Sequence, residues 1–240
     1  MTFDILTLFP GFFLSPLNEG IIHRGIEAGL VRIRIFNLRS FTADRHRTVD
    51  DRPYGGGAGM VLKPEPIWRA VSWLNKIPGA VPRTILLTPQ GRPLRQEQIK
   101  ALSQYQRLLI IAGRYEGVDE RIGDHLCDEQ ISIGDYVLSG GEIAALVLMD
   151  AIIRLIPQVM GSEASGVEES FEESLLEYPQ YTRPATFRGY PVPKVLLSGD
   201  HQKIRAWRRR EALIRTWKRR PDLIRREKLT PEEQVLLKKE

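Results

Sequence analysis

The stretch ISIGDYVLSGGE, residues 131–142, combines a short apolar run with a dense set of glycines. The alternating run of Ile131 and Ile133 breaks at Gly134, and Gly140-Gly141 then precedes an apolar helical pattern. Glycines at the start of a helix suit a bound phosphate, because they let backbone amides approach an anion. However, no Lys-Ser or Lys-Thr follows and the G-x-G-x-x-G spacing is absent. The glycines therefore indicate a close approach of the backbone to some other ligand.

Two further segments repeat this arrangement of apolar run, glycine turn and helical pattern. TILLTPQG (84–91) precedes a helix carrying Ile99 and Leu102, and RLLIIAGRYEG (107–117) precedes VDERIGDHL. Such β-loop-α units, with continuous apolar runs, predict a parallel sheet covered on both faces, and FDILTLF (3–9) supplies another strand. Because ligands bind at the carboxyl ends of parallel strands, we expect the three glycine turns to meet around one ligand.

Composition excludes several classes of protein. The 240 residues are 42% hydrophobic, which is enough for a sizeable core. The longest apolar stretch, 143–156, contains Asp150 and Arg154 and is too short to span a membrane. The N-terminus lacks the pattern of a secretory signal, so a cytoplasmic protein is expected. The single cysteine, Cys127, rules out an internal disulfide, and the four histidines show no zinc-binding spacing.

Positive charge is concentrated at the end of the chain. Residues 201–240 hold 14 Lys and Arg against 6 Asp and Glu, whereas the first 200 residues hold 21 against 24. This segregation suggests a polyanionic partner such as nucleic acid. Ile204, Trp207, Ile214 and Trp217 recur with nearly helical spacing, which predicts a helix capped by Ser198. The segment 161–177, with six acids and no bases, is typical of a linker.

Six sequence blocks in order resemble one known family over essentially the whole chain. The blocks are DDRPYGGGAGM (50–60), LLTPQG (86–91), AGRYEGVDERI (112–122), SIGDYVLSGGE (132–142), YTRP (181–184) and VPKVLLSGDHQKIRAWRRR (192–210). They resemble the bacterial tRNA (guanine-N1)-methyltransferases, which act at guanine 37, beside the anticodon. Such long blocks in register are specific to that family.

The resemblance implies an α/β fold of the SPOUT type, with a trefoil-knotted, parallel-sheet domain followed by a small, mainly helical C-terminal domain. It implies that residues 1–160 bind S-adenosylmethionine, 161–177 form a flexible linker and 178–240 bind tRNA at the anticodon loop. It also implies a homodimer with an active site shared between subunits. The implied donor-contacting residues are Leu87, Thr88, Pro89 and Gln90; Gly113, Tyr115, Glu116 and Gly117; and Ile133, Gly134, Asp135, Tyr136, Val137, Leu138, Gly140 and Gly141.

Methylation of guanine N1 requires a base to remove the N1 proton and a cation to stabilise negative charge on O6. In the family these are an aspartate in a DSF motif and an arginine that follows the third loop. The matching residues are Glu169 of ESF and Arg154. Glutamate keeps the carboxylate on a longer stem, and the adjacent Glu168 is an alternative base.

The resemblance also suggests that Mg²⁺ assists the reaction. Glu116 can meet either the donor's ammonium group or such an ion. The sequence has no compact carboxylate cage, so no residue is assigned as a metal ligand.

Two alternatives remain open at this point. A ribose 2′-O-methyltransferase of the same superfamily would need no base arranged for guanine and would accept adenosine at the same ribose. A catalytically silent RNA-binding protein would keep a donor pocket and bind RNA without methyl incorporation.

Overall fold

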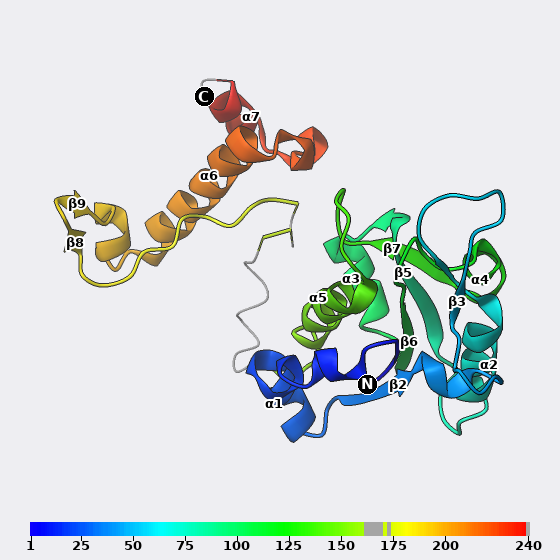
Figure 1. The fold of residues 1–240 in the computed structure, drawn as a ribbon. Helices are drawn as coiled ribbons and strands as arrows, with labels where there is room; N and C mark the ends of the chain where they lie inside the picture. The colour runs from blue at the N-terminus through cyan, green and yellow to red at the C-terminus, as the bar shows by residue number, and fades with distance from the viewer. Residues whose placement is uncertain (161–169, 172–173, 239–240) are drawn as a thin grey trace. The chain divides into compact units, whose positions relative to one another are not determined.

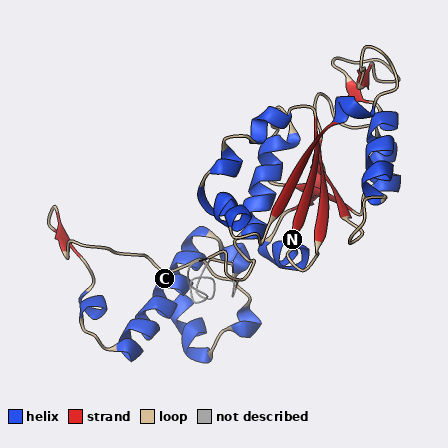
Figure 2. Cartoon of the chain, turned by 90° about the horizontal axis from the view of Figure 1, so that it is seen from below, coloured by secondary structure: helices blue, strands red, loops and turns tan. Residues whose placement is uncertain are grey.

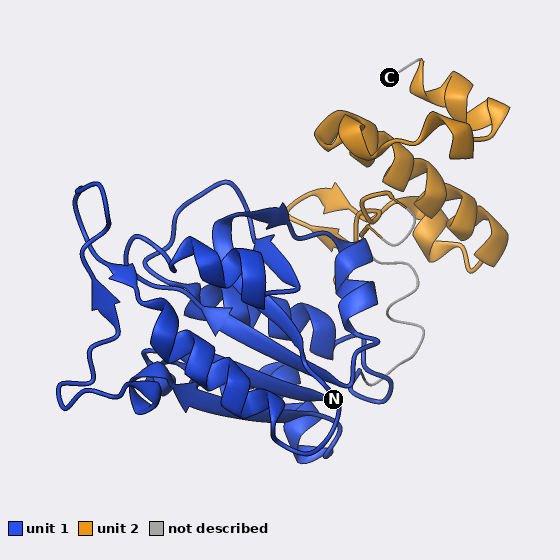
Figure 3. Cartoon of the chain, turned by 90° about the vertical axis from the view of Figure 1, so that its right-hand side faces the viewer, with its two compact units in different colours: residues 1–162 blue, residues 163–240 orange. Residues whose placement is uncertain are grey.

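The computed structural model describes residues 1–160, 170–171 and 174–238, whose helices and strands are labelled in Figure 1. The chain forms two compact units, residues 1–162 and 163–240 (Figure 3). The linker predicted over 161–177 lies partly outside the described residues, so its limits stay a prediction.

Unit 1 is built on a five-stranded parallel sheet. Its strands are β1 (Thr2–Thr7), β2 (Arg32–Asn37), β5 (Arg83–Pro93), β6 (Arg107–Ala112) and β7 (Glu129–Ser132), in the order β2-β1-β6-β5-β7. Each neighbouring pair runs parallel. The predicted α/β class and parallel sheet are therefore confirmed. The short strands β3 (Asp50–Asp51) and β4 (Val61–Leu62) pair antiparallel on either side of the glycine-rich segment 53–60.

Helices cover both faces of this sheet (Figure 2). One face packs against α1 (Gly20–Glu27), α3 (Gln96–Leu102) and α5 (Gly141–Ile153), and the other against α2 (Pro64–Asn75) and α4 (Glu120–Leu126). Side chains alternate between the two cores along each strand, because successive residues of a strand point to opposite faces. In β6, Leu108 and Ile110 join the first core, and Leu109 and Ile111 join the second.

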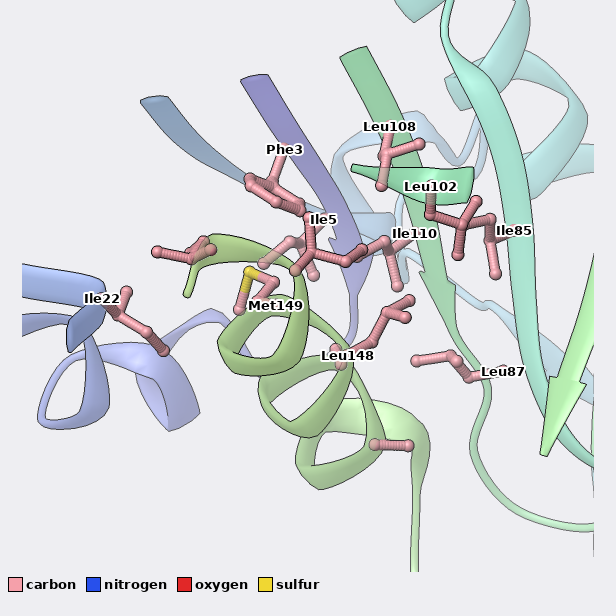
Figure 4. Close-up of a cluster of buried hydrophobic side chains, with 14 of the residues drawn as sticks. Phe3, Ile5, Ile22, Ile85, Leu87, Leu102, Leu108, Ile110, Leu148 and Met149 are labelled. Carbon is pink, nitrogen blue, oxygen red and sulfur yellow. The ribbon is translucent and has the colours of Figure 1, made fainter. Parts of the chain in front are cut away.

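Helix α5 is the main support of the first core. Its Leu148 and Met149 are fully buried and face Ile5 of β1 and Ile110 of β6 (Figure 4). Burial of each such side chain stabilises the fold by about 1.5–3 kcal/mol. Because α5 starts in the glycine turn of the opening motif, this packing holds that turn against the sheet.

The sequence pattern predicts that the strand ends in the turn at Gly91, but β5 continues beyond this residue. Its Leu87 pairs with Ile131 of β7, and after a register shift Arg92 pairs with the same residue. Residues 88–91 therefore bulge out of a strand that continues to Pro93. A Cβ atom at Gly91 would clash with the backbone of Ile131, so only glycine permits the chain to return to the sheet here.

Unit 2 contains α6 (His201–Arg219), α7 (Pro231–Leu237) and a hairpin of β8 (Thr186–Phe187) and β9 (Tyr190–Pro191). Its core is a cluster of four buried residues, Leu175, Ala212, Leu213 and Leu237, joined by Trp217 and other apolar side chains. The predicted helix exists, but its predicted cap is wrong. Asp200, not Ser198, accepts a hydrogen bond from the Lys203 amide at 3.1 Å, because the chain turns through Gly199 at a φ of +72° before the helix begins.

Within the described residues, no helix combines the length and the apolar character needed to cross a membrane.

Candidate functional site

Three loops at the carboxyl ends of neighbouring strands enclose a cavity of about 380 Å³ in unit 1. They are the bulge 88–91 of β5, the segment 113–117 after β6, and the segment 133–140 between β7 and α5. The expectation that the three glycine turns meet is therefore confirmed for these residues.

Direct contacts join the second and third loops. The amide of Gly141 donates to the carbonyl of Gly113 at 2.8 Å, and Arg114 and Gly140 form an antiparallel bridge. A Cβ atom at Gly141 would lie 2.8 Å from Cα of Ala112, inside ordinary contact distance. The absence of a side chain there lets helix α5 begin directly against the end of β6.

The third loop folds back on itself. Gly134 adopts a φ of +151°, and a side chain there would overlap the ring of Tyr136. The Ser132 hydroxyl donates to the Gly134 carbonyl at 3.0 Å, and the Tyr136 hydroxyl donates to the Ile133 carbonyl at 3.2 Å. These contacts give the loop a fixed shape on the cavity side.

The glycine-rich segment 53–60 supports the cavity from outside. The amide of Glu116 donates to the carbonyl of Met60 at 3.0 Å, and the amide of Leu62 donates to the carbonyl of Gly117 at 2.9 Å. The side chain of Glu116 lies against Gly59, where a Cβ atom would overlap its carboxylate. Gly59 thus leaves room for an acid on the cavity wall.

Acidic groups outnumber basic ones around the cavity. Glu116, Asp119 and Glu120 line it, together with one cation, Arg114, among the residues of its wall. Nε and Nη2 of Arg121 donate to the two carboxylate oxygens of Asp119, each at 2.7 Å. These hydrogen bonds hold the pKa of Asp119 below its usual range. Asp119 is therefore an anion near neutral pH whose charge is paired with Arg121, and the other two acids of the wall, Glu116 and Glu120, suit a ligand that carries positive charge.

The structure brings nearly all the predicted donor-contacting residues to this one cavity. Every one of them lines it except Asp135, whose side chain is exposed on the third loop. Their contact with a donor remains a prediction.

Of the two predicted catalytic residues, only Arg154 is among the described residues, and it does not lie in this wall. Arg154 is the C-cap of α5 and lines a separate hollow with Asp150 and Glu19. Ten residues of helix, about 15 Å, separate it from Ala144 at the cavity. Glu169 and its neighbour Glu168 lie outside the described residues.

The sequence does not predict four residues that lie in contact at the cavity, namely Arg114 in its wall and Glu142, Thr7 and Phe9 next to Arg114 or Glu142. Glu142 is fully buried and accepts hydrogen bonds from the Thr7 hydroxyl at 2.7 Å and from Arg114 Nε at 2.9 Å. The guanidinium of Arg114 lies 4.5 Å from the ring centre of Phe9. In the sequence, Arg114 stands between two predicted contact residues, Gly113 and Tyr115. Glu142 gives no signal in the sequence, because an acid in the first turn of a helix is common. The sequence around Thr7 and Phe9 likewise does not indicate their contacts with Glu142 and Arg114.

The described residues contain no group of three or more His, Cys, Asp or Glu side chains placed to hold a metal ion. The suggested Mg²⁺ therefore has no set of ligands in this part of the chain, and no step is assigned to it.

Comparison with known proteins finds extensive similarity. A family model described as tRNA (Guanine-1)-methyltransferase TrmD matches residues 1–226. Relatives named tRNA (guanine-N(1)-)-methyltransferase include one from Carboxydothermus hydrogenoformans, 53% identical over 237 residues that cover 99% of this chain and 92% of the relative. Another, from Gloeobacter violaceus, is 57% identical over 215 residues, covering 89% and 93%. A third, from Geobacillus kaustophilus, is 54% identical over 214 residues, covering 89% and 87%.

Proposed function

The chain belongs to the tRNA (guanine-1)-methyltransferase family, and we propose that it transfers a methyl group from S-adenosylmethionine to N1 of guanine 37 in tRNA. The observation that carries the proposal is the cavity enclosed by the three glycine-bearing loops. Its volume, about 380 Å³, falls within the range of about 300–1,000 Å³ typical of small-molecule pockets.

The charges of the cavity support this donor. S-adenosylmethionine supplies an electrophilic methyl carbon on a positively charged sulfur and also carries an ammonium group. Glu116 and Glu120 place negative charge around the cavity that would receive these groups. The loop backbones around Gly113 and Gly140 leave room for a nucleoside to approach closely.

We assign the proton transfer to Glu169 and the stabilisation of charge to Arg154. Guanine N1 carries a proton at neutral pH, so its lone pair becomes available only when a carboxylate takes that proton. The negative charge then spreads to O6, where a guanidinium lowers the barrier. Glu168 is the alternative base.

The position of Arg154 supports a site shared between two subunits. About 15 Å of helix separates it from the cavity of its own chain, which is too far for a direct contact with a base bound beside the donor. We therefore propose a two-fold dimer whose interface places Arg154 of one subunit at the cavity of the other. Ile143 and Val147 of α5, each 44% exposed, offer an apolar surface for that dimer.

We propose a trefoil knot for the cavity loops. Supporting it, the third loop runs back against the end of β6, with the Gly141 amide bonded to the Gly113 carbonyl. The close contact of Gly141 with Ala112 is what the tight passage of one chain segment past another requires.

Unit 2 is proposed to bind the tRNA. Lys203, Arg205, Arg210, Lys218 and Arg219 are exposed along α6. Two of them also form surface ion pairs, Lys203 with Asp200 at 3.0 Å and Arg210 with Glu211 at 2.8 Å. Arg208 and Arg209 are less exposed, with Arg208 over the Tyr178 ring and Arg209 paired with Glu233 at 2.8 Å. The exposed cations suit phosphate contacts, whereas Arg208 and Arg209 hold the unit together.

Labelled methyl transfer to tRNA tests the reaction. Transcripts with guanine or adenine at position 37 are incubated with the protein and labelled S-adenosylmethionine, and the modified nucleoside is identified by mass spectrometry. We expect label only with guanine, as 1-methylguanosine. Equal incorporation with adenine would indicate ribose methylation, and RNA binding without incorporation would indicate a silent binding protein.

Subunit mixing tests the shared site. Leu138→Trp should fill the cavity from a loop residue, and Glu169→Gln should remove the base, so each homodimer should be inactive. In a freely exchanging mixture, half the dimers are mixed and carry one intact site each, so roughly a quarter of the activity should return. No recovery, with mixed dimers confirmed by native mass spectrometry, would place the complete site within one subunit.

A further inference from the structure

Glu142 is a fully buried carboxylate directly behind the cavity. It occupies the first turn of α5, where its two oxygens accept from the Thr7 hydroxyl at 2.7 Å and from Arg114 Nε at 2.9 Å. A buried charge is costly unless it is paired and hydrogen-bonded, and both conditions are met here. The carboxylate is therefore held in one position, between the end of β1 and the second loop.

Its partner Arg114 is held on three sides. Besides the bond to Glu142, Nη1 of Arg114 donates to the Ser139 carbonyl at 3.0 Å, and the guanidinium lies 4.5 Å from the ring centre of Phe9. The backbone of Arg114 bridges to Gly140. One side chain thus links the second loop, the third loop and the segment after β1.

The charge of Arg114 matters for the ligand. It is the one cationic side chain among the residues that line the cavity, all of which are described. S-adenosylmethionine carries a net charge of about +1, with one carboxylate, one ammonium and one sulfonium group. An unpaired guanidinium in the wall would repel it, whereas the demethylated product S-adenosylhomocysteine has no sulfonium and no net charge.

We propose that Glu142 is a positioning residue that neutralises and holds Arg114, and so sets the preference of the cavity for the charged donor over its neutral product. The inference rests on the proposed function. It predicts that loss of the Glu142 charge weakens donor binding more than product binding, because only the donor carries the extra positive charge. With effective dielectric constants between those of protein and water, the change in preference should be on the order of fivefold.

Calorimetric titration of the full-length protein with S-adenosylmethionine and with S-adenosylhomocysteine tests this directly. Glu142→Gln keeps the shape but removes the charge: its amide oxygen can still accept from Arg114 Nε, whereas its NH2 group can only donate, so the Thr7 hydroxyl must turn to accept. We expect the ratio of donor to product dissociation constants to rise on the order of fivefold. In Glu142→Gln combined with Arg114→Gln both charges are gone, and the ratio should return close to the wild-type value.

A matched control lies on the same strand as Thr7. Asp4 of β1 is also fully buried and paired, with Arg34 at 2.6 Å and Arg107 at 2.7 Å, and none of the three lines the cavity. Asp4→Asn removes a buried charge in the same way and should destabilise the fold without changing the ratio.

The outcomes separate this inference from the proposed function. If the wild-type protein binds neither ligand, the proposed function fails and this inference fails with it. If the wild type binds both, and Glu142→Gln weakens both equally or neither, the inference is overturned while the donor site stands. Should Glu142→Gln not fold, Arg114→Gln alone is measured; it leaves Glu142 unpaired and should tighten the donor relative to the product, and an unchanged ratio would overturn the inference.

Discussion

Replacement of Gly141 by alanine adds one methyl group at the tightest point of the site. The new Cβ atom would lie 2.8 Å from Ala112 Cα, 3.0 Å from Gly113 N and 3.1 Å from the Ala112 carbonyl carbon. Unstrained carbon contacts are about 3.5–4.0 Å, so the start of α5 must move by roughly 0.7–1 Å. All three neighbours are backbone atoms, so no side chain can rotate away to relieve the clash.

The cost of Gly141→Ala follows from two contributions. Overpacking against a rigid backbone costs about 1–3 kcal/mol. The same movement stretches the bond from the Gly141 amide to the Gly113 carbonyl beyond its 2.8 Å, and loss of that bond costs about 0.5–1.5 kcal/mol. We expect a loss of about 2–4 kcal/mol in the free energy of unfolding. Donor affinity should fall at least about tenfold, because binding must restore the displaced cavity wall.

Urea unfolding followed by circular dichroism measures the loss of stability, and calorimetric titration with S-adenosylmethionine measures the loss of donor affinity. Gly11→Ala is the control, because no atom lies within 4 Å of a Cβ atom at Gly11. A Gly141→Ala protein that unfolds at the wild-type urea concentration and binds the donor equally well would refute the argument that the close approach requires glycine.

Three further changes test other parts of the molecule. Glu169→Gln should lower single-turnover methyl transfer at least ~10²-fold with little change in donor binding, since it removes only the proton acceptor; a near-normal rate would transfer the role to Glu168. Arg205→Gln with Arg219→Gln should reduce the slope of log tRNA affinity against log salt by about 1.5, while Lys76→Gln leaves it unchanged; equal slopes would exclude α6 as the phosphate contact. Burial raises the pKa of the Cys127 thiol from 9.0 to about 12, so the folded state keeps a proton that the unfolded state loses. The free energy of unfolding should therefore fall as the pH rises from about 9 towards 12, and Cys127→Ala should remove this part of the pH dependence.

The sequence pattern predicts which segments of unit 1 are strands, but not which strands lie side by side in the sheet. The apolar runs at 84–87 and 107–112 end in glycine turns, and both are buried strands of a parallel sheet. Periodicity shows which face of a strand is buried, but not which strand lies beside it, so the order β2-β1-β6-β5-β7 was not predictable. The return of β5 after its bulge also depends on a partner distant in sequence, at Ile131.

In the candidate site, too, the sequence predicts one part, the loops, and misses another, the contacts behind them. Its loops were predicted through the family resemblance, because their motifs are long and local. The contact between Thr7 and Glu142 joins residues 135 positions apart, and each looks ordinary in its own segment. The cap of α6 was misplaced by two residues, because Ser198 and Asp200 are both good capping residues and only the backbone turn at Gly199 decides between them.

The position of β6 between β1 and β5 has a consequence for the order of events during synthesis. Thr2 pairs with Arg107, so the centre of the sheet cannot form until more than one hundred residues have left the ribosome. Until then β1 and β2 can pair only with each other, and β1 presents an open edge and uncovered apolar side chains. Contacts so distant in sequence slow folding, because a long loop must close before any of them stabilises the chain. We therefore expect the nascent chain to be most prone to aggregation just before β6 emerges.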